Sequence, residues 1–232
     1  MHALGLIGEN FLGVTNTYVI ATIVAVLIFT AFFCGLKSKK LIPSRMQNFF
    51  EWIIESIFNF IDSITGKRER TIEIFPLCAT IFLYVFCSNL IELIPGLGVF
   101  SFLRSPSSDL MFTFSIAIFG MVYIHVKALS KLGLFPYLGK YLNFKNPILF
   151  FVGILEALGE FTRTFSLGLR LFGNLFAGEM LLMVVSSLIA FIVPLPFLAL
   201  EVLVGFIQAL IFSSLIAIFY VITVELEEHE QS

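Results

Sequence analysis

The sequence predicts an all-α polytopic membrane protein with five transmembrane helices, a surface amphipathic helix, and a long, strongly tilted C-terminal helix hairpin. Three observations predict this fold. The 232 residues are 59% hydrophobic and only 13% charged, whereas a soluble globule carries about 25% charged residues. The mean hydropathy is +1.01. The apolar residues also gather in runs of about 20 or more, the length that crosses a bilayer.

The first three apolar runs each match one crossing. We expect residues 1–17 to form an external N-terminal segment. No Lys or Arg precedes the first apolar run, so we do not expect a cleaved signal peptide. The first transmembrane helix is expected over 18–36, which is uncharged throughout. A transmembrane helix pair is expected over 71–126, with its two apolar runs at Thr71 to Ile94 and Leu110 to Val126.

The segment 37–70 between the first two spans has a different pattern. From Pro43 to Thr65, apolar residues recur at helical spacing and polar residues form the opposite stripe. This pattern predicts an amphipathic helix that lies on the inner membrane surface or against the bundle, as an anchor rather than a catalytic element. The apolar stripe comprises Met46, Phe49, Phe50, Ile53, Ile57, Phe60, Ile61 and Ile64.

The last two helices are too long to stand upright in a bilayer. One helix from Pro147 to Val193 would be about 70 Å long at 1.5 Å per residue, against a hydrocarbon core of roughly 30 Å. Pro194 and Pro196 predict a tight turn, after which Phe197 to Val224 returns. We therefore expect 147–224 to form a tilted hairpin, which is suited to be a curved wall against another protein.

The basic residues predict the orientation. Eleven of the 14 Lys and Arg lie in the segments 37–70 and 127–146, and Arg104 alone lies on the other side. Because basic loops stay cytoplasmic, 127–146 is expected to be a cytoplasmic loop and 225–232 a cytoplasmic tail, with the N-terminus outside.

Arg170 is the most informative residue, because it lies in the apolar run from Ser166 to Asn174. A guanidinium keeps its proton, and placing it in mid-membrane costs on the order of 3 kcal/mol on insertion scales. No acid stands three or four residues away from it. Its counter-charge is therefore expected from another helix or another chain.

Small residues surround the arginine on its helical face. Ser166, Gly173 and Ala177 lie near it at about 100° per residue. They would let a foreign helix approach closely, or they would pack helices within this chain. The sequence leaves both possibilities open.

Acidic residues stand on both sides of the arginine. On the same face are Glu156, Arg163 and Asn174, with Glu160 about 80° away and able to pair with Arg163. Glu179 and Glu201 are expected on the outer side, and Gln208 is placed to bond Arg170 across the hairpin. Buried carboxyl groups relay protons, so two aqueous routes that each reach part way are expected, separated by a permanent cation.

The run Ser166-Leu-Gly-Leu-Arg170-Leu-Phe-Gly-Asn174-Leu-Phe-Ala-Gly-Glu179 resembles the signature of subunit a of the F-type rotary ATP synthase, bacterial type. The resemblance continues in Phe206-Ile-Gln208-Ala-Leu-Ile-Phe, and weaker echoes are Asn89-Leu-Ile-Glu92-Leu-Ile-Pro95-Gly and Pro106-Ser-Ser-Asp109. The five-span plan covers essentially the whole chain. Two departures are the missing Asn after Asp109 and Arg163 where relatives often have Lys.

The resemblance implies a stator subunit of a proton channel that drives ATP synthesis, or pumps protons at the expense of ATP, without being an enzyme on its own. Arg170 would face the carboxylates of a rotating c-ring, with Gln208 and Asn174 as its polar neighbours. Glu179 and Glu201 would serve the outer half-channel, and Glu156 the inner one. The implied partners are the c-ring, peripheral stalk subunit b and the lipid bilayer, in a bacterial plasma membrane.

A proton-coupled secondary transporter is the alternative, although it would usually show inverted repeats, and none are visible. An intramembrane enzyme is less expected, since HExxH and Gly-x-Ser-x-Gly motifs are missing. We expect no cofactor or metal, because Cys34, Cys78 and Cys87 all lie in apolar segments. His125 is expected to be a polar interface residue. The net charge of −2 offers no basic face for nucleic acid.

Overall fold

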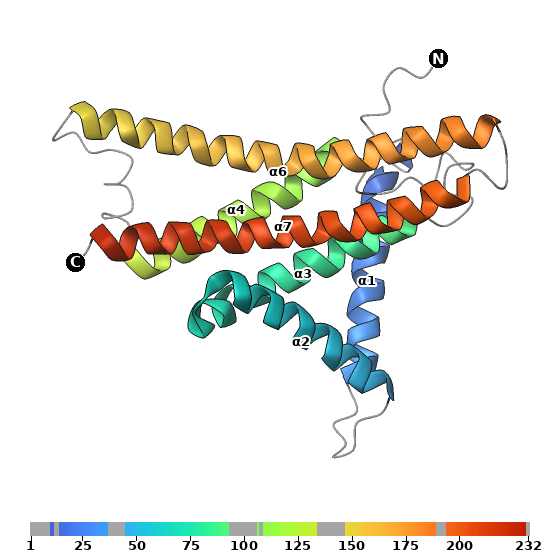
Figure 1. The fold of residues 1–232 in the computed structure, drawn as a ribbon, viewed down its shortest axis with the longest axis horizontal. Helices are drawn as coiled ribbons and strands as arrows, with labels where there is room; N and C mark the ends of the chain where they lie inside the picture. The colour runs from blue at the N-terminus through green and yellow to red at the C-terminus, as the bar shows by residue number, and fades with distance from the viewer. Residues whose placement is uncertain are drawn as a thin grey trace.

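The computed structural model describes residues 10–11, 14–36, 45–92, 106, 109–133, 147–188 and 194–230. Within this part of the chain the fold is helical, as predicted, apart from one antiparallel pair of two-residue strands, β1 (Asn10–Phe11) and β2 (Val14–Thr15), which was not predicted. The helices are α1 (Asn16–Leu36), α2 (Arg45–Thr65), α3 (Arg68–Glu92), α4 (Leu110–Leu132), α6 (Pro147–Leu188) and α7 (Pro194–Glu230) (Figure 1).

Five of these helices are long and apolar enough to cross a membrane, namely α1, α3, α4, α6 and α7. This confirms the predicted fold class. The apolar parts of α1, α3 and α4 are 18 to 24 residues long, which matches a single crossing. The apolar parts of α6 and α7 are 38 and 31 residues long and exceed it. The last two helices therefore need a strong tilt if they are to remain in the bilayer.

The long α6 runs for 42 residues without a break, about 63 Å at 1.5 Å per residue. In Figure 1, α6 and α7 lie along the longest axis of the molecule, and α1 runs across their direction. If α1 stands upright in a bilayer, the hairpin lies far from upright. The arrangement agrees with the predicted tilted pair.

Local sequence explains several helix ends. The carboxylate of Asp109 caps α4 by accepting a hydrogen bond from the Met111 amide at 2.9 Å. Gly66 follows α2 with φ of 68°, a left-handed conformation that favours glycine. The predicted turn at Pro194 and Pro196 is instead the first turn of α7, where proline is tolerated because the amide is not needed. Residues 189–193 lie outside the described part.

The other end of α7 also differs from the expectation. The segment 225–232 was expected to be a tail, but the helix continues to Glu230. The sequence from Val224 onward contains no Pro or Gly that would stop a helix, and Glu and Leu are good helix formers.

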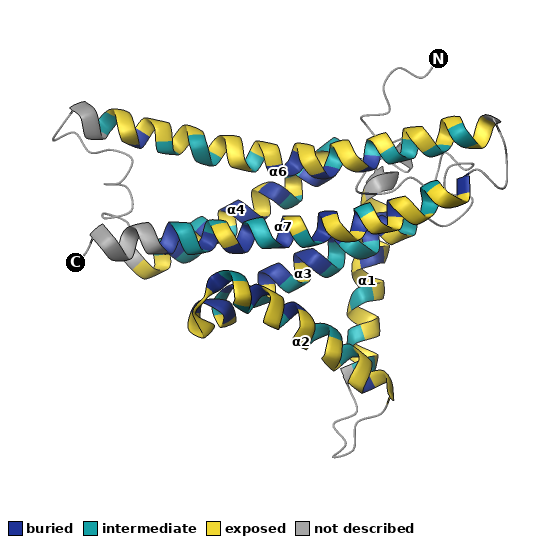
Figure 2. Cartoon of the chain, in the orientation of Figure 1, coloured by how far each residue is buried: buried dark blue, intermediate teal, exposed yellow. Residues whose placement is uncertain are grey.

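The core lies between α3, α4, α6 and α7, with α7 in contact with α2, α3, α4 and α6. Tyr220 and Phe212 of α7 are fully buried, as are Ile74 of α3, Ile124 of α4 and Leu171 of α6. α1 contacts α2 and α3 at the edge of the bundle. Figure 2 shows buried residues concentrated on α3, α4 and α7, whereas much of α6 is exposed.

The amphipathic helix α2 packs against the bundle. Ile57 and Ile61 are buried in the core cluster, and α2 contacts α1, α3 and α7. Met46, Phe49 and Trp52 are exposed along its first half. Apolar and aromatic side chains of this kind are suited to the membrane interface. One face of α2 thus packs against the bundle and the other is suited to the membrane surface, so the helix is compatible with both predicted settings.

Candidate functional site

Arg170 lies on the exposed face of α6. Its side chain makes no ion pair or hydrogen bond with any residue that the structure describes. An adjacent face of the same helix is anchored, because Leu167, Leu171 and Leu175 are at most 2% exposed. The spacing of these leucines at i, i+4 and i+8 therefore fixes the rotation of α6 and turns the arginine outward.

The small residues around Arg170 are not used to pack the described helices together. Ser166, Gly173 and Ala177 are all exposed. A side chain added at Gly173 would meet no atom within 4 Å, and the same holds for Gly159 nearer the start of α6. Of the two possibilities left open by the sequence, packing within this chain is therefore wrong for the described part.

Asn174 and Gln208 join the two long helices. The Asn174 amide donates to Gln208 Oε1 at 2.8 Å, and Gln208 is only 2% exposed. Nε2 of Gln208 has no hydrogen-bond partner among the described residues. The sequence placed Gln208 to bond Arg170, but the structure pairs it with Asn174, one turn further along α6. The two amides thus bond to each other, and neither forms a hydrogen bond with the arginine in the described part of the chain.

The predicted outer acids lie at the α6–α7 contact. Glu201 is 7% exposed, and neither of its carboxyl oxygens has a hydrogen-bond partner in the described part of the chain. Glu179 is close enough for its charge to act on Glu201. Burying a carboxyl group is costly unless it is hydrogen-bonded, so this position needs water or another polar partner.

Two residues around Glu201 carried no role in the sequence analysis. A Cβ added at Gly178 would lie 2.4 Å from Glu201 Oε1, so the glycine makes room for the carboxyl group. On the other side, Asn89 of α3 donates to the Gly205 carbonyl at 3.1 Å, one turn beyond Glu201. Gly178 belongs to the quoted signature run, but only the packing of α7 on α6 shows why a side chain would not fit there.

The predicted inner acids lie near the start of α6. Glu156 and Glu160 are partly buried, and Glu160 Oε2 lies 3.7 Å from Nε2 of His125 on α4. The spacing would allow Arg163 to pair with Glu160, and in the structure its guanidinium lies over the ring of Phe219 at 5.6 Å. The sequence indicated that His125 is a polar interface residue, and it does lie between α4 and α6. Its partner Glu160 was not identified, because the two residues are 35 positions apart in the chain.

A second polar cluster joins α3, α4 and α7. Lys131 Nζ lies 2.6 Å from Glu73 Oε2, and the hydroxyl of Tyr220 donates to the same carboxylate. Lys131 also lies over the Tyr220 ring at 5.9 Å. The cluster neutralises a carboxylate where three helices meet, and the sequence analysis did not identify it.

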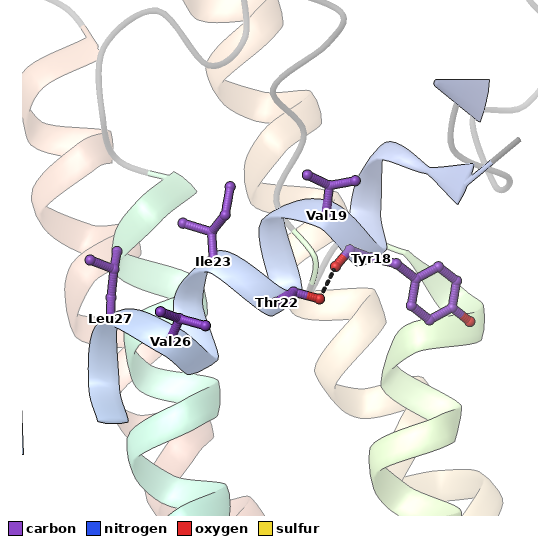
Figure 3. Close-up of a pocket in the computed structure, with 6 residues that line it drawn as sticks. All are labelled: Tyr18, Val19, Thr22, Ile23, Val26 and Leu27. Carbon is purple, nitrogen blue, oxygen red and sulfur yellow. Dashed lines mark hydrogen bonds between the residues drawn. The ribbon is translucent and has the colours of Figure 1, made fainter. Parts of the chain in front are cut away.

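Two further features of the described residues concern ligand binding. An open depression of about 450 Å³ follows the exposed side of α1 and is almost entirely apolar, which suits lipid contact (Figure 3). No group of three or more His, Cys, Asp or Glu side chains that could hold a metal occurs in the described part. The depression is lined by Tyr18, Val19, Thr22, Ile23, Val26 and Leu27.

A family model and individual known proteins that are similar to this chain point to the same family. A family model described as the ATP synthase A chain matches residues 17–221. The ATP synthase subunit a of Geobacter sulfurreducens is 35% identical over 217 residues, which cover 92% of this chain and 86% of the relative. That of Geotalea daltonii is 38% identical over 81% of this chain and 76% of its own length. That of Campylobacter concisus is 30% identical over 96% of each chain.

Proposed function

This chain belongs to the ATP synthase A chain family, and from that membership we propose how its residues carry protons. The chain is the proton-channel stator of the membrane sector. In the proposal, Arg170 separates two offset half-channels, and protons pass between them on the carboxylates of a rotating c-ring. The proton flow drives ATP synthesis, or is reversed when ATP is hydrolysed. The chain itself catalyses no bond chemistry.

One observation carries the proposal: Arg170 is exposed on α6 without a partner among the described residues, on a face that no described helix covers. Of the five apolar helices, α6 has the smallest buried share in its apolar part, 17%. In a bilayer an uncompensated guanidinium is costly, so a neighbour that brings a carboxylate stabilises it. A ring of helices that each carry one carboxyl group would supply such a neighbour repeatedly.

The acids on either side of the arginine support two separate routes. Glu179 and Glu201 gather on one side of Arg170 at the α6–α7 contact, and Glu156 lies fourteen residues before it on α6. In the proposal, a proton enters through Glu179 and Glu201, rides on the ring, and leaves past Glu156. Asn174 and Gln208 keep the surroundings of Arg170 polar between the two routes.

The membrane setting follows from the same family and from the charge pattern. We propose a bacterial plasma membrane, with the N-terminus outside and the C-terminus cytoplasmic, because the segments 37–70 and 127–146 hold most of the basic residues. The ring would lie along the exposed face of α6. The peripheral stalk subunit b is the proposed second partner. The division of the chain into segments, including the hairpin 147–224 as the ion pathway, is part of this proposal.

Proton flux in membrane vesicles that contain the whole complex tests the proposal. Arg170→Ala should abolish ATP-driven pumping while the complex still assembles. The variant loses the barrier between the two half-channels and the counter-charge to the ring carboxylates. Arg163→Ala is a matched control, since Arg163 is a cation two turns earlier on the same helix and its guanidinium lies over the ring of Phe219. Normal pumping by Arg170→Ala would refute the role and favour a secondary transporter instead.

A further inference from the structure

We propose that His125 and Glu160 form a proton-holding pair in the inner half-channel, so that the inner route follows the contact between α4 and α6. This inference rests on the proposed function and deepens it. It adds His125, to which neither the family signature nor the sequence analysis gives a role in proton transfer. It also moves part of the route away from the exposed face of α6 and into the bundle.

The pair is positioned by well-packed helices. His125 Nε2 and Glu160 Oε2 are 3.7 Å apart, and their side chains are 31% and 15% exposed. Further along the same helix contact, the rings of Phe114 and Phe165 have centroids 5.0 Å apart. Phe114 also packs on Gly168, where an added Cβ would lie 3.1 Å from the ring. These contacts set the distance between α4 and α6, and so bring the imidazole to the carboxylate.

The chemistry of the pair suits the storage of one proton. With one proton, the pair is neutral overall, either as imidazolium and carboxylate or as imidazole and carboxylic acid. Moving the proton breaks an N–H bond at His125 Nε2 and forms an O–H bond at Glu160 Oε2, without changing the net charge. A shift of about 1 Å brings the two atoms within hydrogen-bonding distance. Imidazole is also the side chain that titrates nearest to neutral pH.

The position of the pair fits an inner route. Glu156 stands one turn before Glu160 on α6, and Arg170 stands ten residues after it. A proton released by a ring carboxylate on this side of Arg170 would therefore reach two acids and an imidazole in succession. Arg163, the nearest cation on α6, lies over the ring of Phe219 on α7.

Other titratable groups near this end of the bundle already have partners. On α7 and α3, Tyr220 donates to Glu73, and Lys131 of α4 pairs with the same carboxylate. Glu201 of α7 belongs to the outer acids. The Glu73–Lys131 ion pair joins two helices, as the His125–Glu160 pair does. It therefore serves as a control for an ion pair that only holds helices together.

The test measures ATP-driven proton pumping by the whole complex in vesicles, at a series of pH values from about 5 to about 8. The variants are His125→Gln, Glu160→Gln, their double variant, and Glu73→Gln as the matched control. Rates are expressed per assembled complex. Passive proton flux through the membrane sector is measured on the same vesicles after the ATP-hydrolysing part has been removed.

We expect His125→Gln and Glu160→Gln each to reduce both fluxes several-fold and to flatten the pH profile near neutral pH. The double variant should be no slower than the slower single variant, because groups that act as a unit are not additive. Glu73→Gln removes a structural ion pair, so it should lower at most the amount of complex and leave the pH profile unchanged. The exchanged pair, His125→Glu with Glu160→His, should restore flux and gives a folded variant if a single one fails to assemble.

Fluxes per complex equal to those of the unchanged protein, with the same pH profile, would overturn the inference. So would a loss of flux that follows only the amount of assembled complex, since this is the result of a structural tie. Arg170→Ala decides the proposed function independently. If that variant stops pumping while the His125 variants pump normally, the stator role stands and only the inner route proposed here fails.

Discussion

Asn174 and Gln208 bond to each other across the hairpin, and the exposed side chain of Arg170 lies one turn away. The bond is asymmetric in its surroundings, because Gln208 is buried and Asn174 is exposed. If the bond is lost, the exposed Asn174 amide can bond water instead, whereas the buried Gln208 amide is left without its partner. The difference leads to a prediction about the hairpin.

Asn174→Ala should destabilise the hairpin more than Gln208→Leu does. The first change leaves the buried Gln208 amide without its partner, at a cost of about 1–3 kcal/mol. The second leaves an exposed Asn174, which can bond water instead. Heating the solubilised complex and following the loss of this chain from it measures both effects. A greater loss in Gln208→Leu would mean that the bond is not the important contribution of these residues.

Removal of one outer acid should slow proton flux without stopping it. Glu179→Gln and Glu201→Gln each leave one carboxyl group at the same α6–α7 contact, and this group can take over the transfer. The double variant should stop pumping. The measurement is ATP-driven pumping per assembled complex, and Glu69→Gln on α3 serves as a control for charge removal alone. Complete loss of pumping in both single variants would contradict the redundancy.

Gly173→Leu should block assembly with the ring while this chain still inserts and folds. An added side chain at Gly173 meets nothing within 4 Å in the described structure, so the bundle itself has room for it. A helix that packs closely on the Arg170 face would not have that room.

Gly120→Leu is the contrasting variant, because an added Cβ there lies 2.9 Å from Ile216 in the core. It should lower the amount of the chain in the membrane, as overpacking costs typically 1–3 kcal/mol. The amounts of this chain and of the ring recovered together in purified complex separate the two effects. Normal recovery of ring with Gly173→Leu would place the docking face elsewhere.

Much of the fold could be predicted from the sequence, because a helix that crosses a bilayer needs a run of about 20 apolar residues. Apolar runs of about 20 residues or more predicted the five spans, and the alternation of an apolar and a polar stripe at helical spacing predicted α2. The cap of α4 is a local contact too, because the Asp109 carboxylate accepts from the Met111 amide only two residues away. These features depend on residues close together in the chain, so they can be seen in the sequence.

The contacts between helices could not be predicted in the same way. The rotation of α7 relative to α6 decides that Gln208 meets Asn174 instead of Arg170, and that Gly178 receives Glu201. The packing of α4 on α6 likewise brings His125 to Glu160 in place of Arg163. Each of these outcomes depends on the fit of many side chains at once. The extension of α7 to Glu230 was missed for a different reason, because charge alone suggested a tail there.

The unbroken length of α6 has a mechanical consequence. If a ring turns against this helix, as proposed, it pulls the helix sideways, and the stator must resist with an equal and opposite torque. A single continuous rod spreads that force over its contacts with α4 and α7, whereas a broken helix would bend at the break. In the proposed function, the stiffness of one long helix would therefore help to convert the rotation into useful work.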